Sequence, residues 1–98
     1  MATYILLASY TEQGIKGIKD TVRRTDQVKE VAQKHGVKLK ETYWVLGAYD
    51  VIGVFEAPDD ETMTALSLAV AKMGNVKTQT LRAFSAADMK NILGKLGS

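Results

Sequence analysis

The sequence has 98 residues, 46% of them hydrophobic, and its 13 Lys and Arg nearly balance 11 Asp and Glu, leaving a formal net charge of +2. This composition indicates one small globular domain, and so small a charge, spread along the chain, argues against binding to nucleic acid. The absence of cysteine excludes disulfides, thiolate metal sites and cysteine nucleophiles, and a single histidine argues against an all-protein zinc site. No stretch approaches the roughly 20 apolar residues of a membrane span, and no signal peptide is recognisable. We therefore expect a cytoplasmic protein that does not bind membranes.

The predicted elements follow one another without a linker, a repeat or a low-complexity segment. Residues 3–10 carry apolar side chains at both odd and even positions, which is typical of a strand covered on both faces. Residues 11–19 carry two glycines and two lysines and are predicted to be a loop. A stripe at helical spacing and the C-cap glycine Gly36 then predict a helix over residues 20–35; the stripe consists of Arg24, Val28, Val31, Ala32 and His35.

Two strands joined by a turn form the centre of the prediction. Residues 37–46 alternate before they become apolar, so this second strand is expected to begin exposed and end buried. Gly47 supplies the turn, and residues 49–57 form the third strand, which stops at Pro58. Gly53 lies inside that strand, where glycine weakens a strand unless another backbone or a ligand approaches closely.

The last forty residues predict a helix, a strand and a terminal helix. An acidic first turn at residues 59–61 and a C-cap at Gly74 and Asn75 bound the helix, and residues 76–84 form the fourth strand. Ser85 and Asp88 resemble a capping box that opens the terminal helix. The order βαββαβ predicts an α+β, ferredoxin-like domain over residues 1–98, with a four-stranded antiparallel sheet, two helices on one face and a short C-terminal helix.

The sheet is expected to pack against a second copy. The first strand carries apolar side chains at both odd and even positions. In the third strand, Ile52 and Val54 lie on one face, and Val51 and Phe55 lie on the other. A lone ferredoxin-like domain would expose one of these faces as a contiguous apolar patch. We therefore expect a homodimer or higher homo-oligomer formed through the sheet face. The alternative is that the terminal helix folds back over the open face of its own subunit.

Several blocks of the sequence, in order, resemble the GYD domain family, which is named for Gly, Tyr and Asp near the central turn. Here these residues are Gly47, Tyr49 and Asp50. The string at residues 43–50 is followed by matching blocks at residues 56–60, 74–76 and 78–84, so the resemblance covers nearly the whole chain. It implies a small bacterial or archaeal protein of the dimeric α/β-barrel type, a family without an established activity.

Five residues are candidates for ligand binding: Arg24, His35, Trp44, Tyr49 and Asp50. Asp50 either fixes the hairpin by accepting backbone N–H groups or acts as a general base, and Tyr49 either packs with its hydroxyl bonded or acts as a catalytic phenol. His35 is either a partner of the helix C-terminus or a group that binds a ligand or transfers protons. Trp44 either anchors the core or interface or walls a pocket. Arg24 and nearby lysines belong either to a solvated basic loop or to an anion site.

Three functions compete. The first is a non-catalytic module, a homo-oligomer that binds a small organic or anionic molecule and acts as a sensor, carrier or regulator. The second is a cofactor-independent enzyme, similar to monooxygenases or isomerases of the dimeric α/β-barrel type, with Asp50, His35 or Tyr49 as acid or base. The third is a haem or metal binder that uses His35 as axial ligand. We favour the first and expect no cofactor and no metal, because the sequence carries no cofactor fingerprint or metal-ligand cluster.

Overall fold

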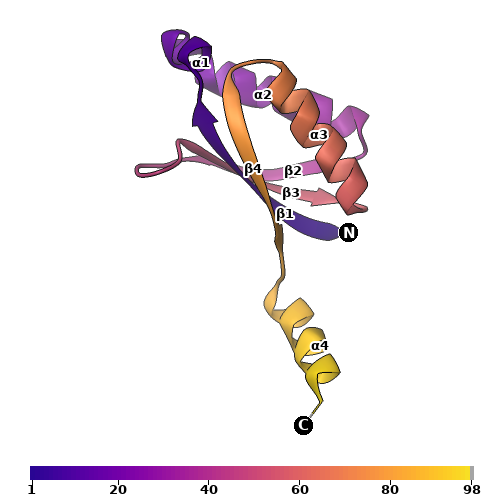
Figure 1. Ribbon diagram of the computed structural model, residues 1–98. Coiled ribbons are helices and arrows are strands. Elements are labelled where there is room, and N and C mark those ends of the chain that lie inside the picture. Colours follow the sequence, from indigo (N-terminus) through magenta and orange to yellow (C-terminus); the bar gives the residue numbers. More distant parts are fainter. Residues whose placement is uncertain (98) are drawn as a thin grey trace.

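A four-stranded antiparallel sheet with two helices on one face forms the body of the protein, as seen in a computed structural model that describes residues 1–97 (Figure 1). The strands are β1 (Ala2–Tyr10), β2 (Lys38–Trp44), β3 (Val51–Ala57) and β4 (Val76–Ala83), in the order β2-β3-β1-β4. The covering helices are α2 (Thr21–Lys34) and α3 (Asp60–Lys72). This is the predicted ferredoxin-like α+β fold, with β1 and β3 at its centre.

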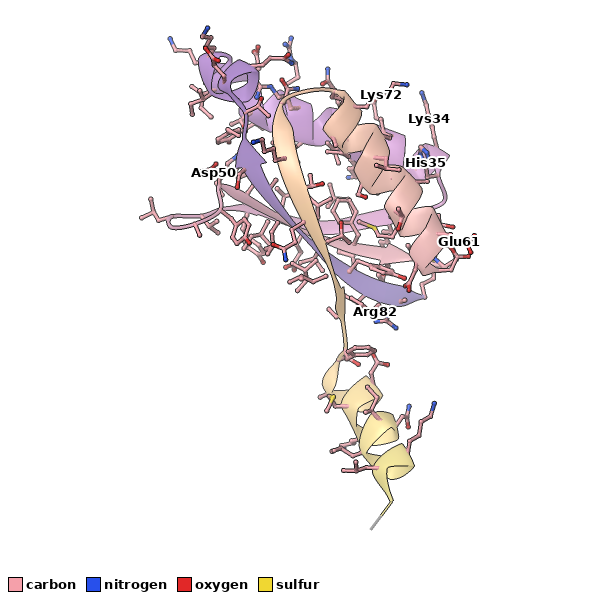
Figure 2. All side chains as sticks on the ribbon, in the orientation of Figure 1. Lys34, His35, Asp50, Glu61, Lys72 and Arg82 are labelled. Carbon is pink, nitrogen blue, oxygen red and sulfur yellow. The ribbon has the colours of Figure 1, made fainter. Side chains whose placement is uncertain are left out.

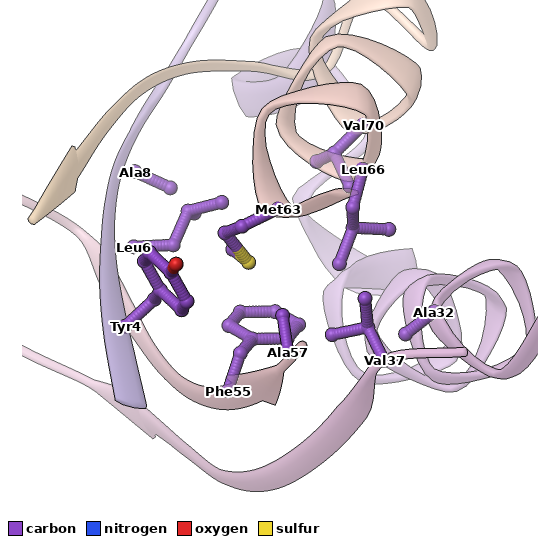
Figure 3. Close-up of a cluster of buried hydrophobic side chains, with 10 residues drawn as sticks. All are labelled: Tyr4, Leu6, Ala8, Ala32, Val37, Phe55, Ala57, Met63, Leu66 and Val70. Carbon is purple, nitrogen blue, oxygen red and sulfur yellow. The ribbon is translucent and has the colours of Figure 1, made fainter. Parts of the chain in front are cut away.

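The core lies between the covered face of the sheet and the two helices (Figure 3). Every second residue of β1 points into it, because side chains alternate between the faces of a strand. The buried side chains from the sheet meet three buried residues of α3 and one buried residue of α2. The buried core comprises Tyr4, Leu6, Ala8, Ala32, Val37, Phe55, Ala57, Met63, Leu66 and Val70.

The opposite face of the sheet, which we call the open face, has no helix over it in the described part of the chain (Figure 1). The strand residues that alternate with the core residues lie here. Its large aliphatic members are Ile5, Leu7, Ile52, Val54 and Leu81. Each of them keeps part of its surface exposed to solvent in the single chain.

The segment that was predicted to be a loop contains two short helices, α1 (Glu12–Lys16) and the 3₁₀ helix η1 (Ile18–Asp20). The hydroxyl of Thr11 caps α1 by accepting the Gly14 N–H at 3.1 Å, and it also donates to the Gly74 carbonyl at 2.6 Å. A Cβ on Gly14 would lie 2.0 Å from the Asn75 carbonyl oxygen. The loop prediction was wrong because these long-range contacts order the segment, and they leave no signal in the local sequence pattern.

The central hairpin is shorter than predicted, since residues 45–50 form a loop in which Gly47 has a φ of 118°. The expectation that the second strand ends buried was wrong for the single chain: the exposed fraction is 53% for Tyr43 and 44% for Trp44. The reason is that β2 is an edge strand. At Gly53 a Cβ would lie 2.7 Å from the ring of Phe55, so this glycine makes room for a core side chain.

The terminal helix α4 (Ala86–Leu96) points away from the rest of the protein (Figure 1). The predicted capping box is present, because Asp88 N–H donates to the Ser85 hydroxyl and Ser85 N–H donates to the Asp88 carboxylate. Since only residues 84 and 85 separate α4 from β4 and the cap fixes its start, the helix continues outward. The alternative in which it covers its own sheet was therefore wrong. Within residues 1–97, no helix has the length and apolar character needed to cross a membrane.

Candidate functional site

A small apolar cavity of about 80 Å³ lies between the sheet and the helix layer. Its walls include Leu6, Val28 and Val70. Among its polar members, Tyr10, Thr21 and Arg24 come from the end of β1 and the start of α2. Pockets for metabolite-sized ligands usually measure about 300–1,000 Å³. The cavity is too small for such a ligand unless the helix layer moves.

The hydroxyl of Thr21 joins three elements at the polar end of this cavity. It accepts the Trp44 indole N–H at 3.0 Å and lies 2.8 Å from the hydroxyl oxygen of Tyr10. Trp44 therefore connects β2 to the first turn of α2. Neither Tyr10 nor Thr21 was a sequence candidate, because only the tertiary fold brings residues of the first strand, the first helix and the second strand together.

Arg24 lines the cavity, but its guanidinium is directed at backbone carbonyls. One nitrogen donates to the Gly14 oxygen at 3.0 Å and another donates to the Gly17 oxygen. Arg24 thereby fastens the segment of α1 and η1 to α2. Two nearby cations have carboxylate partners at the surface: Lys16 lies 3.1 Å from Glu12, and Arg23 lies 3.3 Å from Asp20.

Asp50 connects the end of the hairpin loop to the central strand. Its carboxylate accepts the Tyr10 N–H at 2.9 Å, and its own N–H donates to the Ala8 carbonyl at 2.9 Å. Its carbonyl accepts the Val45 N–H at 2.9 Å, which closes the loop. These bonds hold Asp50 in a fixed position next to the end of β1.

Tyr49 and His35 lie apart from the polar end of the cavity. The Tyr49 hydroxyl donates to the side-chain oxygen of Gln79 at 2.7 Å, across the open-face side of the sheet. His35 is exposed at the C-terminus of α2, where its Nδ1 lies 2.9 Å from the Val31 carbonyl oxygen. Asp50 and His35 stand on opposite sides of the molecule (Figure 2). The structure therefore brings Arg24, Trp44 and Asp50 to one end of the sheet. Tyr49 lies at the same end, but its hydroxyl is bonded on the open face, and His35 lies at the far end of α2.

A second hollow, open to solvent, lies at the start of α3 beside the end of β4. Here the buried Tyr4 donates its hydroxyl to the Asp60 carboxylate, and the Arg82 guanidinium lies 5.5 Å from the centre of the Tyr4 ring. The bond to Asp60, together with burial, raises the pKa of Tyr4. Asp59 caps α3 by accepting the Thr62 N–H at 2.8 Å. Hydrogen bonding from the Thr62 side chain and from its N–H lowers the pKa of Asp59. Apart from the acidic first turn of the helix, no sequence pattern predicted this group of residues.

Residues 1–97 contain no group of three or more His, Asp or Glu side chains that could hold a metal ion. The exposed His35 ring has the Val31 carbonyl beside it and belongs to no such group.

Comparison with known proteins adds the family. The sequence model of the GYD domain matches residues 4–93. The chain is 38% identical over 93 residues to the glutamine synthetase and cystathionine beta-lyase binding protein of Thermus thermophilus, covering 91% of this chain and 95% of that protein. Two solved structures share the fold. FFRP-DM1 has a TM-score of 0.61 at 21% identity and covers 86% of this chain and 100% of its own. TTHA0845 from Thermus thermophilus has a TM-score of 0.58 at 23% identity and covers 88% of this chain and 96% of its own. The chain belongs to the GYD domain family.

Proposed function

We propose that this chain is a homo-oligomeric binding module with a regulatory role in the cytoplasm, in which two copies pack sheet to sheet and the assembly binds other proteins. The observation that carries the proposal is the open face. It offers five apolar side chains on adjacent strands, namely Ile5, Leu7, Ile52, Val54 and Leu81. A second copy would remove this apolar surface from water at a favourable free energy of about 25 cal/mol per Å².

Protein partners are favoured over metabolites for a geometric reason. The cavity of about 80 Å³ is smaller than a metabolite site, and the Arg24 guanidinium already donates to two backbone carbonyls. The Thermus relative is named for binding two enzymes, which supports a role for this chain in binding enzymes as well. A small organic or anionic ligand of metabolite size would need an opening of the helix layer or a pocket formed between copies.

Catalysis and haem binding draw less support from the geometry. The three side chains that an enzyme would use lie in different places: Asp50 is held against β1, Tyr49 is bonded to Gln79, and His35 stands at the end of α2. General acid–base catalysis requires such groups within hydrogen-bond reach of one substrate. An axial haem ligand also needs an apolar pocket around it, whereas His35 is exposed.

Sedimentation equilibrium at micromolar concentration tests the assembly. We expect a dimer for the natural chain and a monomer for Val54→Lys, because the substitution would place two unpaired charges in the apolar interface. Leu68→Lys is the matched control: Leu68 is 65% exposed on α3, and its replacement should leave the dimer intact. A natural chain that is monomeric at this concentration would refute the proposal.

Binding of enzymes is tested separately with immobilised protein. We expect purified glutamine synthetase or cystathionine β-lyase to bind the natural chain in a saturable manner, and we expect Val54→Lys to bind more weakly if the assembled form is the binding form. Serum albumin serves as the control analyte. Failure of both enzymes to bind at micromolar concentration would remove the enzyme-binding part of the proposal and leave the dimer.

A further inference from the structure

The two helices that cover the sheet differ in how closely they pack on it. Helix α3 buries three large side chains, those of Met63, Leu66 and Val70. Helix α2 buries only Ala32, near its C-terminus. Protein interiors normally contain few voids larger than a water molecule, because side chains interdigitate. The cavity of about 80 Å³ is lined by the first half of α2, where this helix has no large buried side chain.

Small side chains on both layers leave this space open. From α2, Thr21 and Thr25 line the cavity at positions where a core-facing helix normally carries large apolar residues. From the sheet, Ala8 and Gly53 line it, and Ala8 belongs to the buried core (Figure 3). The cavity therefore follows from the choice of residues at facing positions of two different elements.

The polar end of the cavity keeps one hydrogen-bond donor unused. The hydroxyl oxygens of Tyr10 and Thr21 lie 2.8 Å apart and share one hydrogen bond, and the Thr21 oxygen also accepts the Trp44 indole N–H. Each hydroxyl carries one hydrogen, so the pair has two donors and uses one of them internally. Within residues 1–97 no acceptor faces the second hydroxyl hydrogen. A ligand oxygen at this end would satisfy it.

The charges around the cavity select against ions. No carboxylate and no lysine of the described residues lines it, so a bound cation would have no counter-charge. The single guanidinium, that of Arg24, already donates to the carbonyls of Gly14 and Gly17 and is not free to bind an anion. Transfer of an unpaired charge from water into such a site is costly. The cavity therefore suits an uncharged ligand.

We propose that this cavity is a binding site for a small uncharged molecule with an apolar body and one oxygen atom, of the size and chemistry of a short-chain alcohol. A water molecule occupies about 30 Å³ in the liquid, so the cavity offers the space of roughly three waters, or about three to five non-hydrogen atoms. The apolar body would contact residues such as Val28 and Leu6, and the oxygen would accept from the Tyr10 and Thr21 pair. The site lies within one chain and does not require the sheet-to-sheet dimer.

Nuclear magnetic resonance with 2-propanol tests the site, because the chain has a single tryptophan whose indole N–H marks the polar end. We expect a saturable shift of the Trp44 indole signal with a dissociation constant of about 1–10 mM, as suits a ligand of so few atoms. Isopropylammonium has nearly the same shape and a charge, and it should give no saturable shift. A linear response to 2-propanol, equal to that of isopropylammonium, would overturn the proposal.

The position of the probe is measured on the natural chain. We expect nuclear Overhauser effects from the methyl protons of 2-propanol to the methyl groups of Val28 and Leu6, which line the cavity. Effects confined to exposed residues such as Leu46 and Leu81 would place the probe on the surface and overturn the proposal. This measurement needs no substitution, so it does not depend on whether a variant folds.

Two variants fill the cavity from opposite layers. Ala8→Val enlarges a side chain of the sheet, and Thr25→Leu enlarges one of α2. Each should weaken binding of 2-propanol about tenfold or more and raise the melting temperature, because the added atoms occupy the ligand's space and restore contacts across it. Natural affinity in a folded filling variant would show that the probe binds elsewhere.

Thr64→Leu is the matched control for Thr25→Leu. The Thr64 hydroxyl donates to the Asp60 carbonyl at 2.7 Å, one turn back in its helix, as the Thr25 hydroxyl donates to the Thr21 carbonyl at 3.2 Å. Thr64, however, is exposed on α3 and does not line the cavity. Its replacement should leave the dissociation constant within about twofold of the natural value. An equal loss of binding in Thr64→Leu and Thr25→Leu would contradict the assignment of the cavity.

Discussion

The two faces of the sheet carry similar side chains and have different surroundings. On β1, Leu6 is 6% exposed beneath the helix layer, while its neighbours Ile5 and Leu7 face the other way and keep part of their surface in water. The helices α2 and α3 cover the first face, and no described helix of the same chain covers the second. The alternation of side chains along a strand thus assigns each residue to one face of the sheet. Whether helices cover that face then decides whether an apolar residue stabilises the fold or is available for assembly.

Phe55→Ala should produce the largest difference between the faces. Phe55 is 2% exposed in the core, and its removal should lower the free energy of unfolding by about 3–5 kcal/mol, because a cavity remains. Val54→Ala, the adjacent substitution on the open face, should cost much less at concentrations where the chain is monomeric. Urea unfolding monitored by circular dichroism measures both. Equal losses would mean that the open face is also covered within one chain.

Glycine substitutions extend the comparison to the helices. Gly14→Ala should lower the free energy of unfolding by about 1–3 kcal/mol, because its Cβ would meet the Asn75 carbonyl and the backbone must shift. Gly94→Ala is the control on α4, where a Cβ meets nothing within 4 Å and alanine is the better helix former. In thermal unfolding, the melting temperature should fall for Gly14→Ala and should rise or stay unchanged for Gly94→Ala. A loss for Gly94→Ala would show that this face of α4 is in contact.

Substitutions of Asp50 separate a structural role from a chemical one. Asp50→Ala removes the acceptor of the Tyr10 N–H and should cost about 1–2 kcal/mol in urea unfolding. Asp50→Asn keeps an acceptor oxygen and should cost less. If Asp50 instead served as a general base, Asn and Ala would abolish turnover alike, whatever their stabilities.

The pH dependence of stability gives the smallest expected effect. The bond to Asp60 favours the neutral phenol of Tyr4 in the folded state and raises the pKa of Tyr4 above 10.0. The contribution of this bond to the free energy of unfolding is complete below the pKa of Tyr4 in the unfolded chain. It is lost as the pH rises through the pKa of Tyr4 in the folded protein. Urea unfolding between about pH 9 and 12 should therefore show a steeper loss for the natural chain than for Tyr4→Phe. Tyr43→Phe, an exposed tyrosine bonded to Glu41, is the control and should change this slope less.

Much of the fold could be predicted because it depends on patterns between residues that are close together in the sequence. Apolar runs and alternation predicted the strands, a helical stripe predicted α2, the acidic first turn and the C-cap predicted α3, and Ser85 with Asp88 predicted the start of α4. The short helix α1 could not be predicted, because Thr11 and Gly14 are ordered by contacts with residues 74 and 75, some sixty positions away.

The candidate site was harder to predict for the same reason. Asp50 bonds to Tyr10, and Trp44 bonds to Thr21, through contacts that no local pattern encodes. Tyr49 and Asp50 are adjacent in the sequence, but the Asp50 carboxylate accepts the Tyr10 N–H, whereas the Tyr49 hydroxyl donates to Gln79. His35 shares a helical stripe with Arg24, yet the 14 residues of α2 place the two about three turns apart.

The central position of β1 also has a consequence for the making of the protein. This strand is synthesised first, yet its two neighbours are β3 and β4, which begin at Val51 and Val76. Neither edge of β1 can be paired until most of the chain has left the ribosome, and pairings between such distant residues form slowly. An apolar strand with two open edges is prone to associate with other chains while it waits. We therefore expect this protein to complete its folding only at the end of translation and to depend on chaperones more than its length suggests.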